Sequence, residues 1–233
     1  MPSSFSIFLD IGHAYGAKAG ASANGIVEQE YNLEVRNRVA GVYTARTALE
    51  HLISQFNPYV PDINGFIQPL YYKLMVNTND EGGLNGKYSE RIKKAQNFGA
   101  SAYIQMHCNS GGGKYAIVGY HNYGPMKEYS ERMAEIFAEI YNSEIEKTSF
   151  NEALKDIQIW PCTSHHEDIG HRNIAACLSS ASIPAILIEP FFLDNKGHAE
   201  YMKTDEGINL LSRTYLRAMD KIADEFTENV GGN

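Results

Sequence analysis

Three short apolar runs, each finishing at an ionisable residue, constrain the fold of this chain more than any other feature. The runs are IFLDI, followed by Gly12 and His13; SAYIQM, followed by His107; and PAILIE, which ends in Glu189. Apolar runs of this length are typical of strands that are buried on both faces. Longer segments with helical spacing separate them, and this alternation predicts an α/β fold with mostly parallel strands.

The whole chain, residues 1–233, is predicted to form a single domain. We expect a twisted sheet of about six strands with helices on both faces, because further strands are predicted near 71–78, 114–124 and 157–160. Helices are predicted over 28–56, 126–147 and 205–226, with shorter helices over 87–98 and near 172–180. Residues 57–70, rich in Pro, Asn and Gly, predict an irregular excursion, and no linker separates a further binding domain.

Charge and composition exclude several classes of protein. The net charge of −8 argues against a general binder of nucleic acid or of anionic membranes. No apolar run approaches the 18 residues typical of a membrane span, and the N-terminus shows no signal-peptide pattern. Three cysteines without CxxC spacing predict reduced thiols, which fits synthesis in a reducing cytoplasm. We expect a monomer.

The polar residues at the strand ends predict one metal-centred site. In open α/β sheets, ligands bind beyond the carboxyl ends of the strands, where His13, His107 and Glu189 would meet. Glu28 and Glu30 add carboxylates at the start of the long helix. Two imidazoles and one carboxylate suit catalytic zinc with an open position for water. A second carboxylate would then move the proton.

Four blocks of sequence resemble the zinc-dependent N-acetylmuramoyl-L-alanine amidases of the amidase-3 type. IFLDIGH is similar to the family's strand ending in Asp-Pro-Gly-His, and NGIVEQEYNL to its Gly-x-x-Glu-Lys-Asp-x-Asn-Leu element. SERIKKAQNFGASAYIQMHCNS resembles its Arg…Ala-Asn…Ser-x-His-x-Asn-Ala region. IPAILIEPFFLDN resembles Pro-Ala-x-Leu-x-Glu-x-Gly-Phe-x-x-Asn. The blocks agree in order and rough spacing over nearly the whole chain.

The resemblance implies one Zn²⁺ ion bound by His13, Glu28 and His107, with Glu189 as the catalytic carboxylate. It favours Glu28 over Glu30 because Glu28 lies four residues before Asn32, as the family's ligand lies before its Asn. The implied reaction is hydrolysis of the amide between N-acetylmuramic acid and L-Ala of the peptidoglycan stem peptide. A chain without a signal peptide would be a phage endolysin or an autolysin that reaches the cell wall after release.

The sequence departs from the family pattern around these residues. Ile11 replaces a proline, and Ala14-Tyr15 replaces a glycine pair. Cys108 stands where a small residue is usual, and Pro190-Phe191 where a small residue and Gly are usual. No departure removes a predicted ligand, but the departures predict a substrate groove of different shape.

Four further residues are predicted to support the site or to contact substrate. Asp10 and Asn109 would orient the loops beside the metal, and His121 would line the groove. Arg172 could contact a substrate carboxylate or phosphate, because its guanidinium suits either group.

Two other clusters are less informative. The segment HHEDIGHR, residues 165–172, could bind a second metal, although a solvated loop is favoured. Residues 111–113, GGG, have no following GK[ST], so a flexible rim is favoured over a phosphate loop.

Two alternatives to the amidase prediction stay open. A zinc carboxypeptidase or endopeptidase acting elsewhere on the stem peptide would use the same metal chemistry. A non-catalytic wall-binding module of the same fold is the alternative outside the enzymes.

Overall fold

The structure of the whole chain is a computed structural model. The structure describes residues 5–13, 20–56, 72–76, 88–150, 154, 157–162, 178 and 181–228. The predicted excursion over 57–70, the segment HHEDIGHR and the helix predicted near 172–180 lie outside the described residues, apart from position 178.

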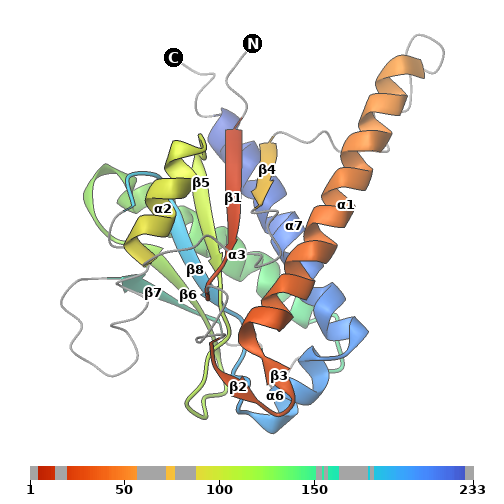
Figure 1. Cartoon of the computed structure of the whole chain (residues 1–233), viewed down its shortest axis with the longest axis vertical. Coiled ribbons are helices and arrows are strands. Elements are labelled where there is room, and N and C mark those ends of the chain that lie inside the picture. The colour runs from red at the N-terminus through yellow and green to blue at the C-terminus, as the bar shows by residue number, and fades with distance from the viewer. Residues whose placement is uncertain are drawn as a thin grey trace.

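A six-stranded sheet forms the centre of the molecule (Figure 1). Its spatial order is β4-β1-β5-β8-β6-β7. The strands are β1 (Phe5–Ile11), β4 (Tyr72–Val76), β5 (Ala102–Met106), β6 (Ala116–His121), β7 (Ile157–Cys162) and β8 (Ala185–Glu189).

The sheet is mostly parallel, as predicted, but it contains one reversal of direction. Strands β4, β1, β5 and β8 run in one direction. Strand β6 is antiparallel to β8, and β7 is parallel to β6. The carboxyl ends of β6 and β7 therefore lie at the opposite end of the sheet from the carboxyl ends of β1, β5 and β8.

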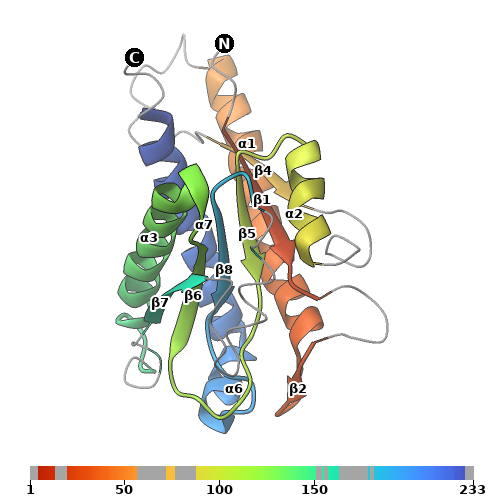
Figure 2. The ribbon, with the colours of Figure 1, turned by 90° about the vertical axis from the view of Figure 1, so that its left-hand side faces the viewer.

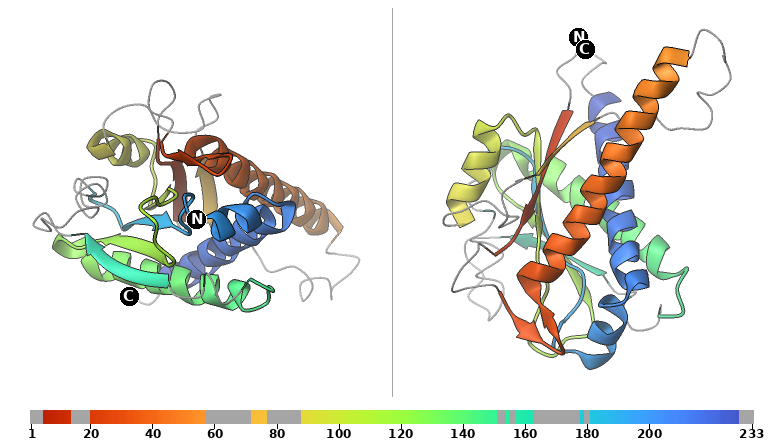
Figure 3. Two further views of the ribbon diagram at one scale, coloured as in Figure 1. Left: turned by 90° about the horizontal axis from the view of Figure 1, so that it is seen from below. Right: turned by 45° about the vertical axis from the view of Figure 1, so that its right-hand side comes forward.

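Helices cover both faces of the sheet, which confirms the predicted α/β architecture. Helices α1, α3 and α7 cover one face, and α2 lies on the other (Figure 3). The helices and one short 3-10 turn are α1 (Glu28–Phe56), α2 (Tyr88–Asn97), η2 (Gly124–Met126), α3 (Lys127–Ile145), α6 (Lys196–Met202) and α7 (Asp205–Glu228).

The core has one part on each face of the sheet, which explains the continuous apolar runs. Along β5, Ile104 and Met106 pack toward α1, α3 and α7. Tyr103 packs on the opposite face with Leu187 of β8 and Ile92 of α2. Successive residues of a strand point to opposite faces, so a strand covered on both sides needs apolar residues throughout.

The structure also contains short elements that the sequence patterns do not predict. Strands β2 (Ser22–Ala23) and β3 (Ile26–Val27) form a hairpin whose turn is Asn24-Gly25, with φ of 50° and 79°. Asn-Gly is the preferred pair for such a turn. This hairpin and α6 lie at the end of the sheet where β1, β5 and β8 finish (Figure 2).

Among the helices in the described part of the chain, none combines the length and apolarity that crossing a lipid bilayer requires.

Candidate metal centre

His13 reaches the end of the sheet through a turn packed against β5. The turn follows β1, and the backbone N–H of Gly12 donates to the Met106 carbonyl at 2.8 Å. A Cβ atom at Gly12 would lie 2.1 Å from the His107 ring. Glycine is therefore required here, because any side chain would separate the two strand ends that carry the histidines.

Glu28 is the first residue of α1, and its carboxylate lies between the two histidines. Oε1 lies 3.0 Å from His107 Nδ1 and accepts a hydrogen bond from the backbone N–H of Cys108 at 2.9 Å. Oε2 lies 3.1 Å from His13 Nε2 and accepts from the Ala21 N–H at 2.9 Å. Backbone donors thus hold both oxygens in place while each remains beside an imidazole nitrogen.

His13, Glu28 and His107 form a cluster that could bind a metal ion. One donor atom from each residue lies within 4.8 Å of the others. Bonds of about 2.0–2.1 Å in a tetrahedral zinc site place two ligand atoms about 3.3 Å apart. The separations between His13 Nε2 and Glu28 Oε2, 3.1 Å, and between His107 Nδ1 and Glu28 Oε1, 3.0 Å, are each close to this value and involve different oxygens of the carboxylate.

The cluster favours the protonation states that bind metals. Burial alone would raise the pKa of Glu28, but hydrogen bonds from His107 and His13 outweigh burial and lower its pKa well below the usual value. Burial lowers the pKa of His107, partly opposed by Glu28. A carboxylate and a neutral imidazole are the forms that coordinate metal ions.

Glu189 lies beside His107 because of the register between β5 and β8. Met106 pairs with Ile188, and the His107 N–H donates to the Ile188 carbonyl at 2.8 Å. Burial, and to a smaller extent the charge of Glu28, raises the pKa of Glu189 to about 8. A carboxyl with this pKa can hold or release a proton near neutral pH.

Asp10 belongs to a buried network that holds the turn after β1. Arg91 of α2 places Nε and Nη2 each 3.1 Å from an Asp10 carboxylate oxygen, and Tyr103 donates its hydroxyl to the same carboxylate. Arg91 also donates to the carbonyls of Ile11 and Gly12. The guanidinium thereby orients the backbone immediately before the first histidine of the cluster.

Asn109 joins the loops that follow β5 and β8. Its backbone N–H donates to the Phe191 carbonyl, and its own carbonyl accepts from Leu193, both at 2.9 Å. Its side-chain oxygen accepts from the Ser110 N–H at 2.8 Å. Asn24 of the β2–β3 hairpin also donates to the Leu193 carbonyl at 2.8 Å. Asn109 therefore supports the rim of the site.

The glycine-rich loop at this rim is tied down by Asp194. The Asp194 carboxylate accepts from the N–H groups of Gly111 and Gly112 at 2.7 and 2.8 Å. Asn195, which caps the start of α6, donates to the Gly113 carbonyl at 3.2 Å. Hydrogen bonds therefore fix a loop that the sequence predicted to be a flexible rim.

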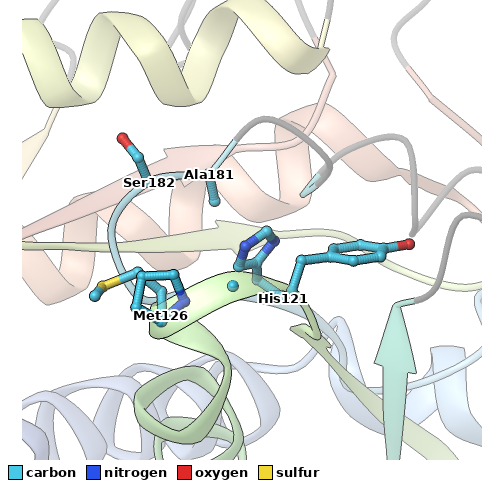
Figure 4. Close-up of a pocket in the computed structure, with 7 residues that line it drawn as sticks. His121, Met126, Ala181 and Ser182 are labelled. Atoms are coloured by element: carbon cyan, nitrogen blue, oxygen red, sulfur yellow. The ribbon is translucent and has the colours of Figure 1, made fainter.

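His121 does not lie with the cluster, because β6 runs against β8. The pair Ile117 and Glu189 lies at one end of the shared ladder, so His121 lies at the other. There it lines a hollow of about 260 Å³ with Met126, Ala181 and Ser182 among others (Figure 4). The expectation that His121 lines the groove beside the metal site does not agree with this placement.

Some predicted residues lie outside the described part of the chain. They include Arg172, the candidate second-metal residues 165–171 and Cys177. Cys108 and Cys162 are buried and free, as predicted.

Two residues that hold the site, Arg91 and Asp194, have no role predicted from the sequence. Arg91 lies four residues before the buried Ala95 and next to the buried Ile92. An arginine on the apolar face of α2 is the sequence feature that could have identified Arg91 as a buried supporting residue. Asp194 had no such signal, because its role depends on two loops that are far apart in sequence.

The family model described as Amidase_3, N-acetylmuramoyl-L-alanine amidase, matches residues 7–221. Two relatives align over most of the chain. The endolysin of Bacillus phage SPP1 is 23% identical over 217 residues, which are 93% of this chain and 65% of that protein. The N-acetylmuramoyl-L-alanine amidase CwlM of Bacillus licheniformis is 24% identical over 220 residues, which are 91% and 66%. The chain thus spans slightly less than two thirds of the length of these relatives.

The fold is also similar to that of a solved amidase structure. The N-acetylmuramyl-L-alanine amidase Ami1 from Mycobacterium smegmatis superposes with a TM-score of 0.65 at 16% identity, covering 96% of this chain and 98% of that one. The family model spans all of the sequence from β1 into α7, including the three residues of the metal cluster. The chain therefore belongs to the Amidase_3 family of N-acetylmuramoyl-L-alanine amidases.

Proposed function

We propose that this chain hydrolyses the amide between N-acetylmuramic acid and L-Ala of the peptidoglycan stem peptide, using one zinc ion. The observation that carries the proposal is the His13–Glu28–His107 cluster with Glu189 on the adjacent strand end. Family membership supplies the substrate class. Peptidoglycan is accordingly the proposed partner, and the endolysin relative supports action at the cell wall.

The three clustered residues suit zinc by their donor atoms. Two imidazole nitrogens and one carboxylate oxygen form a typical catalytic zinc set with a fourth position left for water or substrate. Bound zinc would polarise the scissile carbonyl and lower the pKa of water. We assign His13, Glu28 and His107 as the ligands, with Asp10 supporting the His13 turn through Arg91.

Glu189 is assigned as the residue that moves protons. As a carboxylate it would accept a proton from the attacking water, and as a carboxylic acid it would deliver that proton to the amine of L-Ala. Its raised pKa of about 8 supports this assignment, because both forms are accessible near neutral pH. Asn109 and the loop tied to Asp194 would form one wall of the groove.

Analysis of reaction products separates the amidase from its alternatives. Purified peptidoglycan is digested with the zinc-loaded protein, and the products are identified by mass spectrometry. Release of intact stem peptides with free N-terminal L-Ala is expected. A cut within the peptide would instead identify a carboxypeptidase or endopeptidase, and no cut would favour a wall-binding module.

The matched control is Glu189→Gln, which keeps the size of the side chain and removes its titrating group. We expect a loss of at least about 100-fold in rate with zinc content unchanged, since general acid–base catalysis contributes on this scale. Undiminished cleavage by Glu189→Gln would contradict the assignment of Glu189.

A further inference from the structure

Gln105, on β5, is a buried amide without a partner. Its side chain is fully buried, and neither Oε1 nor Nε2 makes a hydrogen bond within the part of the chain that the structure describes. Burying a polar group without a hydrogen bond opposes folding, so such a residue requires an explanation. An apolar residue of similar size would pack at this position without that penalty.

The position of Gln105 relates it to the proposed catalytic carboxylate. Gln105 pairs with Leu187 across β5 and β8, and the ladder continues to His107 beside Glu189. Because side chains alternate along a strand, Gln105 shares a face of the sheet with His107 and Glu189 and lies two residues behind them. Diagonal neighbours on one face are within reach of long side chains.

Two other polar residues beside Gln105 on this face, Asp10 and His107, already have partners. His107 Nδ1 lies 3.0 Å from Glu28 Oε1. Asp10, which pairs with Gln105 across β1 and β5, accepts from Arg91 and Tyr103. The Glu189 carboxyl, in contrast, makes no hydrogen bond with any residue that the structure describes. A fully buried amide and a partly exposed carboxyl, neither with a partner among the described residues, therefore lie diagonally on one face.

We propose that Gln105 is a positioning residue whose amide donates a hydrogen bond to the Glu189 carboxylate, directly or through one water, in the zinc-loaded enzyme. The amide offers two donors, and the carboxylate accepts. Hydrogen bonds of catalytic groups are often long in the empty enzyme and shorten when the site is assembled. The interaction would hold Glu189 in the orientation that proton transfer needs, and it rests on the catalytic role proposed above.

The variant Gln105→Met tests the proposal, because methionine has a similar length and no comparable donor. The matched control is Tyr215→Phe on α7, which removes a different buried polar group, a hydroxyl that lacks a partner among the described residues. In the zinc-free protein, each substitution should leave the thermal midpoint unchanged or raise it, because the group removed has no partner in the part of the chain that the structure describes. Only Gln105→Met should lower kcat, by at least tenfold, with KM and zinc content unchanged.

Two outcomes for the variant Gln105→Met would overturn the proposal. The first is an unchanged kcat in Gln105→Met. That result would refute the role of Gln105 without contradicting the proposed amidase function. The second is a Gln105→Met protein that loses zinc and stability together with its activity, which would assign Gln105 a purely structural role.

A readout that does not depend on activity completes the test. Denaturant unfolding of zinc-loaded wild type, Gln105→Met, Glu189→Met and the double variant forms a cycle that reports coupling between the two side chains. Non-additive midpoints are expected, and additive midpoints would overturn the proposal. If the wild type releases no stem peptides, the proposed function fails, while this cycle still decides whether Gln105 pairs with Glu189.

Discussion

At the scale of single residues, the proposed metal centre depends on supporting side chains as well as on the proposed ligands. Arg91 contacts the Asp10 carboxylate and two backbone carbonyls before His13, all from a buried position on α2. Lysine could replace its charge but not its planar set of donors.

Arg91→Lys should therefore weaken zinc binding without removing a ligand. Loss of such supporting contacts typically costs about 10- to 100-fold in metal affinity. Competition with a chromophoric chelator measures the affinity directly. The control is Arg132→Lys on α3, a partly exposed arginine paired with Glu225, which should leave zinc binding unchanged. Equal zinc affinity in wild type and Arg91→Lys would contradict the supporting role.

At the scale of elements, two helical glycines should respond to the same substitution in opposite directions. A Cβ atom at Gly41 in α1 meets nothing within 4 Å, whereas a Cβ atom at Gly207 in α7 would lie 2.5 Å from the Tyr201 carbonyl oxygen. Gly41→Ala should stabilise the protein by about 0.5–1 kcal/mol, because alanine favours the helix. Gly207→Ala should destabilise it. Denaturant unfolding of both variants checks the pair, and a shared sign would refute the argument.

Helices α3 and α7 are joined by a buried carboxylate whose contribution should depend on pH. Glu144 lies 2.6 Å from Lys147 and 3.2 Å from Arg213, and it also contacts Arg217. Burial raises the pKa of Glu144, but these hydrogen bonds outweigh it and the net pKa is lowered. A lowered folded-state pKa contributes stability above the unfolded value of 4.5 and loses it as the pH falls through the folded value.

Glu144→Gln should consequently destabilise the protein at pH 7 by about 1 kcal/mol, a small value because half-exposed partners are screened by solvent. The difference from wild type should shrink as the pH falls below 4.5. Urea unfolding at several pH values measures this difference in stability. The control is Glu139→Gln, which breaks an exposed pair with Lys221 and should change the stability less. A difference that grows in acid would contradict the sign.

The sequence predicted elements well where burial leaves a periodic pattern. The bounds Phe5–Ile11 of β1 and Glu28–Phe56 of α1 agree with the prediction, because an apolar run and a helical period marked them. Helix α6 and the β2–β3 hairpin were too short for a period, although Asn24-Gly25 marked the turn. The residues of β6 do not indicate whether the strand runs parallel or antiparallel to β8. The position of His121 relative to the site could therefore not be predicted.

At the scale of the whole molecule, metal binding should stabilise the entire domain. The three proposed ligands come from the turn after β1, the start of α1 and the end of β5, which unfolding would separate. At a free zinc concentration of 100 times Kd, ligand linkage supplies about 2.7 kcal/mol.

Removal of zinc with a chelator should therefore lower the Tm, and added zinc should restore it, as followed by calorimetry. Glu189→Gln should keep the zinc-dependent shift, because Glu189 is not a proposed ligand. His107→Ala should lose the shift. A wild-type Tm that is indifferent to zinc would contradict the metal assignment.

The hydrogen bonds between the rim loops have a consequence for protein engineering. The loop over 108–114, the loop over 190–195 and the hairpin over 22–27 are braced against one another through Asn109, Asp194, Asn195 and Asn24. Exchanging a single loop with that of a related enzyme would leave acceptors and donors without their counterparts. A graft intended to alter substrate recognition at the proposed site should therefore transplant the three segments as one cassette.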